Sequence, residues 1–310
     1  MHPDGTRVSA AILLAGGLRP SPIVAEIGRS VLDLHLTRQR TGLELWLARL
    51  DELGEMLAPG FRVRVIHGGT GVVPREPRWT PEGVVLSIES HRGEFRGPAG
   101  IARDAASSED PDALLLIAEA ARFCGSPLAP LIERHKSLGA DVTVATNPDG
   151  TPAGIYLVRA GCLSIVPEIG FTDLKEQWLT RARGAGYAVW CDRFGEPGAM
   201  PLRTREDCVR AARAAAGQSS DLRRYSMLGR LDGVEDGVSV VAPGAVVEPG
   251  AVVRDSIICE GAVIGAGAVV VRSVVAPGAR VEAGAAVVDL ALSGFGMGGT
   301  RNGRGRGGVL

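Results

Sequence analysis

This chain of 310 residues has almost no net charge, no closely spaced pair of cysteines and no long apolar run. Its formal net charge is -1, which argues against nucleic acid or an anionic membrane surface as a partner. The five cysteines are scattered without any C-x-x-C spacing, which predicts reduced thiols in a cytoplasmic protein rather than a disulfide framework or a zinc site. The apolar stretch from Val8 to Leu14 is too short for a signal peptide or a membrane span. Small molecules and other proteins are therefore the expected partners.

A regular ladder of aliphatic residues occupies the C-terminal part of the chain. Its members follow one another at intervals of six residues, or five in two places, and a small residue stands two positions before each. The ladder consists of Val241, Val247, Val253, Ile258, Ile264, Val270, Val275, Val281 and Val287, and the small residues are Ser239, Ala245, Ala251, Ser256, Ala262, Ala268, Ser273, Ala279 and Ala285. Neither the period of a helix nor that of a strand produces this register. The ladder is the signature of a β-helix built from hexapeptide repeats.

Histidine is absent from these repeats, and this limits the chemistry they can perform. One class of enzymes with hexapeptide repeats, the acyltransferases, places a general-base histidine at a subunit interface of the solenoid. All histidines of this chain lie upstream of the repeats, at His2, His35, His67, His91 and His135. Because the coils offer no evident base, acyl transfer is the least favoured of the functions considered.

Apolar strands alternate with amphipathic helices between residues 8 and 216. The predicted strands are Val8 to Leu14, Val63 to Ile66, Val84 to Ile88, Leu114 to Ala118, Asp141 to Ala145, Ile155 to Val158 and Tyr187 to Cys191. The predicted helices are Gly42 to Leu57, Pro127 to Leu138, Thr172 to Arg183 and Thr204 to Ala216. This alternation predicts an α/β domain whose sheet is largely parallel, with helices on both faces. Such sheets bind ligands beyond the carboxyl ends of their strands.

Two segments rich in small residues lie where such a ligand would bind. One ends the first strand and the other precedes a predicted helix at Ile101 to Ala106. Glycines let the backbone pass close to a phosphate or a base, and a helix N-terminus attracts anions; a tight turn would need the same glycines. The candidate nucleotide-binding residues are Leu14, Ala15, Gly16 and Gly17 in the first segment and Gly97, Pro98, Ala99 and Gly100 in the second.

Together these segments and the repeat resemble the sugar-1-phosphate nucleotidyltransferases, which include mannose-1-phosphate guanylyltransferases and glucose-1-phosphate adenylyl- and thymidylyltransferases. The resemblance is carried by residues 11–17 (AILLAGG), 96–104 (RGPAGIARD), 135–145 (HKSLGADVTVA), 154–158 (GIYLV), 171–179 (FTDLKEQWL), 203–212 (RTREDCVRAA) and the repeats from 238 onward. It implies a Rossmann-like nucleotidyltransferase domain of the GT-A type with a mostly parallel sheet, followed by a short left-handed β-helix. It also implies a bound nucleotide or sugar nucleotide and, in an active member, Mg²⁺.

The chain departs from this family in the segment that grips the triphosphate. Family members continue the double glycine as G-x-G-T-R and then place a lysine in a P-K-P segment. Here Gly17 is followed at once by L-R-P, and residues 23–29 contain no lysine. Arg19 or Arg29 replaces part of this charge if the protein is active, although arginine and lysine differ in reach and geometry. Arg19 and Lys175 are the catalytic candidates; a solvated lysine on an amphipathic helix explains Lys175 equally well.

The magnesium site and the sugar-binding hairpin that the resemblance implies are also depleted. In the family, the strand matching Leu114 to Ala118 ends in G-D, and a W-x-D-I-G segment supplies a second carboxylate for the metal. Glu119 is the carboxylate left near the first position, and Gly198 to Leu202, near the second, contains none. Glu119 is therefore the metal candidate, beside the alternative of a helix-capping or solvated acid. The E-K-P hairpin is replaced by a turn at Thr146 to Gly154.

These departures together predict a protein that keeps the nucleotidyltransferase fold and a nucleotide or sugar-nucleotide pocket but has weak or no turnover. We expect it to regulate or scaffold an active relative. The alternative is an active, Mg²⁺-dependent enzyme with rewired residues that joins a nucleoside triphosphate to a sugar 1-phosphate and releases pyrophosphate. The end coils of a short solenoid need covering, so we expect a homo-oligomer or hetero-oligomer that assembles through the β-helix.

The composition also predicts where the chain divides. The nucleotidyltransferase-like domain is expected at residues 1–225, because a polar segment after residue 216 reads as a linker. The β-helix then covers residues 226–291. Residues 292–310 are rich in glycine and arginine with little apolar surface to bury, which predicts a disordered tail.

Overall fold

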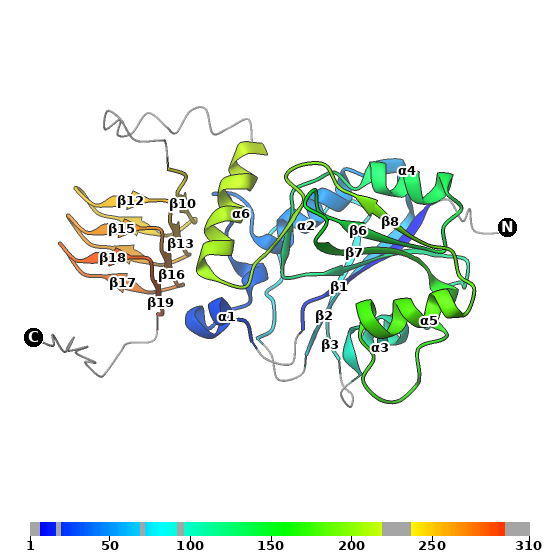
Figure 1. Ribbon diagram of the computed structural model, residues 1–310. Coiled ribbons are helices and arrows are strands. Elements are labelled where there is room, and N and C mark those ends of the chain that lie inside the picture. The colour runs from blue at the N-terminus through cyan, green and yellow to red at the C-terminus, as the bar shows by residue number, and fades with distance from the viewer. Residues whose placement is uncertain (1–6, 17–19, 69–71, 92–95, 219–236, 295–310) are drawn as a thin grey trace, which may run out of the picture.

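The computed structural model describes residues 7–16, 20–68, 72–91, 96–218 and 237–294. An α/β domain and a stack of short strands lie on either side of helix α6 (Arg205–Gln218), as Figure 1 shows. Gly17, Arg19, the predicted linker around residue 225 and the predicted tail beyond residue 294 lie outside the described residues. Within the described ranges, no helix is long and apolar enough to cross a membrane.

The α/β domain is built on one seven-stranded sheet. In spatial order it consists of β3 (Val85–His91), β2 (Leu57–Gly68), β1 (Val8–Leu14), β4 (Leu114–Glu119), β7 (Pro152–Arg159), β6 (Val142–Thr146) and β8 (Val189–Arg193). β7 runs antiparallel to both of its neighbours, and the other neighbouring pairs are parallel. All seven predicted strands lie in this sheet, which confirms the predicted α/β class with a mostly parallel sheet. β7 is the exception because a short turn joins it to β6, and so short a connection allows only an antiparallel pair.

Helices cover both faces of this sheet, as the alternation predicts (Figure 1). One face carries α2 (Gly42–Asp51) and α4 (Ala129–Ser137), and the other carries α3 (Gly97–Ala105), the helical turn η4 (Leu174–Trp178) and α5 (Leu179–Gly184). Trp46 of α2 and Trp178 of η4 are the largest fully buried side chains. The smaller elements are α1 (Pro22–Ile27), η1 (Val31–Asp33), η2 (Gly54–Met56), η3 (Ala160–Leu163) and the antiparallel pair β5 (Arg122–Cys124) and β9 (Ala199–Pro201).

Two helix boundaries differ from the prediction by more than two residues. α2 ends at Asp51 rather than at Leu57, because Gly54 adopts a φ of 48° and Leu57 already begins β2. α3 begins at Gly97 rather than at Ile101, so the G-P-A-G segment forms the first turn of the helix instead of a loop in front of it. Pro98 suits this place, since proline lacks an N–H that the first turn would leave unpaired.

The repeat forms a parallel β-helix with three sheets. The first contains β10 (Val240–Val241), β13 (Ile257–Ile258), β16 (Val274–Val275) and β19 (Ala291–Leu292); the second contains β11 (Val246–Val247), β14 (Val263–Ile264) and β17 (Arg280–Val281); the third contains β12 (Val252–Arg254), β15 (Val269–Val271) and β18 (Ala286–Val288). The five-residue steps of the ladder fall at the corner after the third sheet. There Asp255 and Arg272 adopt positive φ values of 49° and 45°, which makes the corner tight. The handedness inferred from the family resemblance stays a prediction.

Serines take the small-residue position at this tight corner, and their hydroxyls connect the coils. Ser256 Oγ donates to Arg254 O at 2.7 Å and accepts from the N–H of Ser273, 17 residues on, at 3.1 Å. Ser273 accepts in the same way from the N–H of Leu290 at 3.2 Å. The ladder residues from Ile258 onward are buried, whereas Val247 in the first coil is 40% exposed. Val247 is less covered because the first coil has a neighbouring coil on one side only.

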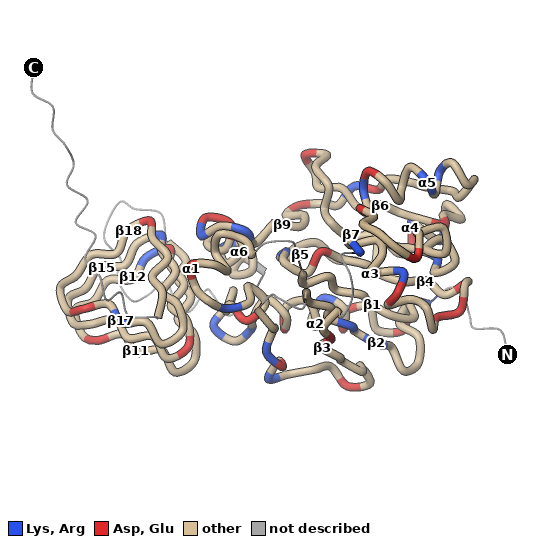
Figure 2. Tube along the Cα trace, turned by 90° about the horizontal axis from the view of Figure 1, so that it is seen from below, with Lys and Arg blue, Asp and Glu red and all other residues tan. Residues whose placement is uncertain are grey.

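The β-helix shares an apolar core with the α/β domain. Side chains of α1 and α6, among them Ile23 and Cys208, belong to the same buried cluster as Ile258 of the solenoid. Ion pairs join the two units around this core, including Arg78 with Glu260 at 2.6 Å. Acidic and basic residues are interspersed over both units in Figure 2. Packing against the α/β domain therefore covers one side of the solenoid. All five cysteines are free thiols, as the sequence predicts.

His135 joins α4 to the sheet and is expected to make stability depend on pH. Its Nδ1 lies 2.8 Å from Thr143 Oγ1 in a buried contact. Burial lowers the pKa of His135 to about 4, with Arg159 and Lys136 acting in the same direction and Asp141 against them. The imidazole of the unfolded chain has a pKa of about 6.5. As the pH falls, the unfolded state therefore takes up the proton before the folded state does. The contribution of His135 to the free energy of unfolding is therefore fully present above that pH. It is lost as the pH drops toward the pKa of the folded state.

We expect the His135→Gln variant to remove much of this slope. Urea unfolding of wild type and variant, measured at a series of pH values across this window, gives the comparison. A wild-type slope that persists unchanged in the variant would show that other groups carry it.

Candidate functional site

The carboxyl ends of β1 and β4 lie side by side where the order of the strands reverses. From β1 the chain continues to β2 and β3 on one side of the sheet, and it later returns to β4 on the other side. Leu14 and Glu119 are register partners, and the N–H of Ala120 donates to Leu14 O at 2.9 Å. In open α/β sheets, ligands bind in the crevice at such a switch point. The first predicted nucleotide segment and the metal candidate therefore meet where sheet geometry favours a ligand.

Glu119 is held between two cations at this edge. Its Oε1 lies 2.7 Å from Lys175 Nζ, and its Oε2 accepts from Arg122 Nε at 2.9 Å. The Arg122 side chain is 9% exposed, while those of Glu119 and Lys175 are 28% and 36% exposed. The structure thus brings together Lys175 and Glu119, two candidates from distant parts of the sequence. We call Glu119, Arg122 and Lys175 the switch-point cluster.

The turn η4 positions Lys175 for this contact. Asp173 Oδ1 caps the turn by accepting from the N–H of Lys175 at 2.6 Å and of Glu176 at 2.9 Å. The other side of η4 is anchored by Trp178, which is fully buried and donates from Nε1 to Cys162 O at 3.0 Å. Lys175 is therefore not the freely solvated lysine of the alternative reading, since its ammonium group is paired.

Glu119 is ionised in this setting. Burial raises its pKa, but the charges and hydrogen bonds of Arg122 and Lys175 outweigh burial and leave the pKa below its ordinary value. Glu119 consequently neither caps a helix nor faces only solvent. Arg122 is not among the residues predicted from the sequence; its signal there is a cation three residues after the carboxylate, at the turn from β4 into β5.

Strand β7 passes directly beneath the switch-point cluster at Gly154. This residue has a φ of 68°, and an added Cβ would lie 2.4 Å from Arg122 Nε and 2.9 Å from the Glu119 carboxyl carbon. Two residues further on, Tyr156 is fully buried and its hydroxyl has no hydrogen-bond partner among the described residues. Burial raises the pKa of Tyr156, and the charge of Glu119 adds to this effect. The phenol therefore stays protonated and is an unused donor in this part of the core.

The residues present do not fit the divalent cation that the family resemblance implies. Both oxygens of Glu119 already face cations. β9 does lie beside β5, with the N–H of Leu202 donating to Ala121 O at 3.0 Å, but Gly198 to Leu202 brings no carboxylate. No group of three or more histidine, cysteine, aspartate or glutamate side chains suited to a metal occurs in the described part of the chain. The metal role of Glu119 is not supported by this geometry.

The turn between β6 and β7 is as short as the sequence predicts. The N–H of Asn147 donates to Thr151 O at 2.7 Å, and Asn147 Oδ1 accepts from the N–H of Ala199 at 2.8 Å. The Asn147 side chain thus fastens the turn to β9. The loss of a sugar-binding hairpin, which the family resemblance implies, stays a prediction.

Gly16 has a packing role that the sequence pattern does not reveal. A Cβ at this position would lie 2.7 Å from the backbone nitrogen of Gly68 at the end of β2. The glycine therefore allows two strand ends to approach each other. Leu14 is buried and Ala15 partly so; their proposed contact with a nucleotide stays a prediction, as do the roles of Gly17 and Arg19.

The N-terminus of α3 packs against the segment before η4. A Cβ on Gly97, whose φ is 69°, would lie 2.6 Å from Thr172 O and 2.8 Å from the Phe171 ring. The N–H of Ala99 donates to the same Thr172 oxygen at 3.1 Å. One amide of this helix N-terminus is therefore already occupied. Nucleotide binding by Gly97, Pro98, Ala99 and Gly100 stays a prediction, and only Pro98 among them is partly exposed.

Arg29, the other arginine considered for the triphosphate, lies elsewhere. It lines a cavity of about 280 Å³ between the end of α1 and the β-helix, together with Ile27, Val73 and Pro277. It is thus directed toward the junction of the two units and not toward Glu119.

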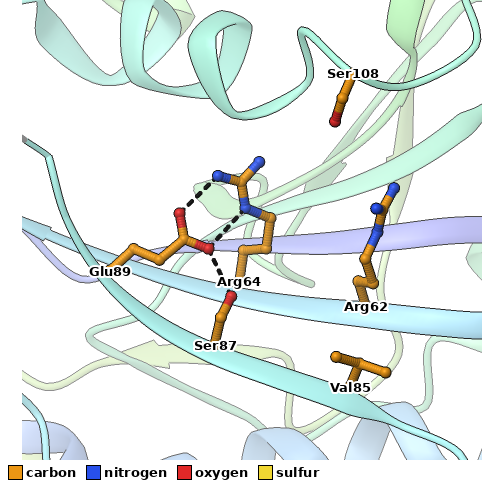
Figure 3. A pocket seen from close by; sticks show the side chains of 6 residues that line it. All are labelled: Arg62, Arg64, Val85, Ser87, Glu89 and Ser108. Carbon is orange, nitrogen blue, oxygen red and sulfur yellow. Dashed lines mark hydrogen bonds and ion pairs between the residues drawn. The ribbon is translucent and has the colours of Figure 1, made fainter.

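A second cavity, of about 270 Å³, lies on the sheet near its β3 edge (Figure 3). It is lined by Arg62, Arg64, Val85, Ser87, Glu89 and Ser108. Arg64 is paired with Glu89 through contacts of 2.9 and 2.6 Å, and the pKa of Glu89 is lowered by this hydrogen-bonded arginine. Arg64 lies opposite Ile12 of β1, well before the strand ends. This cavity therefore lies part-way along β2 and β3 and not at the carboxyl ends of the strands, and its arginines already have carboxylate partners.

No protein-family model matches this sequence, and no curated protein matches it. Among solved structures, a putative glucose-1-phosphate thymidylyltransferase from Bacillus anthracis, in complex with a sucrose, is similar at 14% identity and a TM-score of 0.47, covering 66% of this chain and 94% of that one. A homologue, from Mycobacterium sp. strain JC1, of a Mycobacterium tuberculosis protein is similar at 18% identity and a TM-score of 0.47, covering 69% and 99%. These likenesses concern the fold. They carry nothing about activity.

Proposed function

We propose that the α/β domain binds a nucleotide or sugar nucleotide at the carboxyl ends of β1 and β4, with weak or no turnover, and acts as a regulatory or scaffolding relative of the sugar-1-phosphate nucleotidyltransferases. The observation that carries the proposal is the switch-point cluster, in which Glu119 is neutralised by Lys175 and Arg122. Two cations and one carboxylate at the carboxyl ends of neighbouring strands favour a ligand with phosphate groups. The same ion pairs remove the carboxylate on which metal-assisted phosphoryl transfer would rely.

The second candidate is an active nucleotidyltransferase with rewired residues. Lys175 favours it, because a partly exposed ammonium group can stabilise the charge of a transferring phosphoryl group. Release of pyrophosphate from a nucleoside triphosphate and a sugar 1-phosphate would establish this activity.

The β-helix is the surface we assign to a protein partner, either another copy of this chain or an active relative. The outward face of β12, β15 and β18 exposes Val252, Val269 and Val288 by 50%, 36% and 42%. Val252 and Val269 are register partners on neighbouring strands, and exposed apolar side chains grouped on a sheet face are typical of interaction surfaces.

Thermal unfolding of the full-length protein with ATP, GTP, UTP, dTTP and sugar nucleotides tests the binding proposal. We expect at least one ligand to raise the melting temperature, because a ligand at a hundred times its Kd stabilises the folded state by about 2.7 kcal/mol. A melting temperature unchanged by every ligand, with and without Mg²⁺, would refute it. Pyrophosphate release above the blank would decide for the second candidate.

A further inference from the structure

We infer that the ammonium group of Lys175 takes the place of a divalent cation at Glu119, so that this site binds the phosphate groups of its ligand without a metal. The inference rests on the proposed function, since it concerns how the same site holds a nucleotide. Its basis is the disagreement between the switch-point cluster and the metal site that the family resemblance implies.

The contacts of Glu119 leave no place for a hard cation. Mg²⁺ binds carboxylate oxygens at about 2.0–2.1 Å in a near-octahedral shell that retains water. Here Lys175 Nζ lies 2.7 Å from one oxygen and Arg122 Nε lies 2.9 Å from the other. A metal ion would have to displace one of these groups and then lie beside the positive charge of the remaining one. Such a move loses a charge-assisted hydrogen bond and adds like-charge repulsion.

Lys175 also has what a phosphate ligand needs. An ammonium group has three donors, and the contact with Glu119 uses one of them. Its side chain is 36% exposed, so a ligand can approach it from solvent. Arg122, at 9% exposure, stays fixed on Glu119 and keeps that carboxylate compensated. Nearby Asp173 directs its carboxylate to the backbone amides of η4.

The two possible roles of Glu119 predict opposite changes in ligand affinity when its charge is removed. Glu119 competes with ligand phosphates for the ammonium group of Lys175. If Lys175 replaces the metal, the Glu119→Gln substitution removes this competitor and tightens binding. If Glu119 instead holds a metal ion, the same substitution weakens binding and abolishes its dependence on Mg²⁺.

The experiment is calorimetric titration of the full-length protein with inorganic pyrophosphate and with the four nucleoside triphosphates, in EDTA and in Mg²⁺. We expect binding in EDTA to be at least as tight as in Mg²⁺. Glu119→Gln should tighten it by about two- to fivefold. Lys175→Met should weaken it by about tenfold or more, and Lys175→Arg should restore part of it because the charge is kept.

Lys136→Met is the matched control. Lys136 is the other lysine of this chain and lies exposed on α4, so its removal changes the net charge equally without touching the cluster. Melting temperatures without ligand separate lost binding from lost folding. Binding that requires Mg²⁺ and disappears in Glu119→Gln overturns the inference while the proposed nucleotide binding stands. Absence of binding in the wild type, with every probe and in both buffers, overturns the proposed function and the inference with it.

Discussion

Replacing Gly154 with alanine is expected to destabilise the α/β domain by about 2–5 kcal/mol. The residue has a φ of 68°, where a side chain costs about 1–2 kcal/mol. The new Cβ would also lie 2.4 Å from Arg122 Nε and 2.9 Å from the carboxyl group of Glu119. Overpacking of this kind costs a further ~1–3 kcal/mol. The Arg122 guanidinium and the Glu119 carboxylate must both shift away from β7 to admit the new Cβ.

Gly150→Ala separates the two contributions to this effect. Gly150 lies in the turn between β6 and β7 with a φ of 84°, and an added Cβ there would meet no atom within 4 Å. The control therefore suffers the backbone cost alone, about 1–2 kcal/mol. Guanidinium unfolding of both variants gives the difference. Equal losses of stability would show that β7 does not press against the Glu119–Arg122 pair.

Removing the Trp178 side chain is expected to cost about 3–5 kcal/mol, as for other large core side chains cut back to alanine. Trp178 is fully buried among side chains from the sheet, α3 and η3, and its indole N–H donates to Cys162 O. It also lies in the same helical turn as Lys175. Trp178→Ala should therefore loosen η4 and weaken the contact of Lys175 with Glu119 in addition to lowering stability.

Trp190→Ala provides the matched control, because the same side chain is removed from an exposed place. Trp190 lies on the edge strand β8 and is 46% exposed. We expect its loss to change the free energy of unfolding by less than about 1 kcal/mol. Trp178→Phe should fall between the two, since it keeps much of the apolar volume and loses the hydrogen bond. Losses of similar size for Trp178→Ala and Trp190→Ala would contradict the anchoring role of Trp178.

The sequence by itself determined the architecture of this protein. The strand from Val8 to Leu14 is predicted to the residue, and the ladder of small and aliphatic residues predicts the parallel β-helix. Both signals are local, because hydrophobic period and repeat length depend on neighbours within one strand or coil. The five-residue steps were visible in the same way, and they mark the corners at Asp255 and Arg272.

The local sequence pattern was not sufficient to assign the roles of two glycines. Gly16 and Gly97 stand where a ligand could approach, and the sequence assigned them to a nucleotide. In the structure their missing Cβ atoms leave room for the backbone at Gly68 and Thr172. A glycine pattern records only that something comes close, and whether this is a ligand or another segment depends on contacts between distant parts of the chain.

The chemical state of the site was decided by the tertiary structure alone. The sequence named Glu119 as a metal candidate and Lys175 as a catalytic one, with no reason to connect them. Their ion pair arises because β4 ends at the switch point of the sheet while Trp178 and the Asp173 cap hold η4 over the same edge. Periodicity predicts which elements form. Which charges meet at their ends follows from the packing of those elements, because electrostatic contacts depend on distances in space and not on separation along the chain.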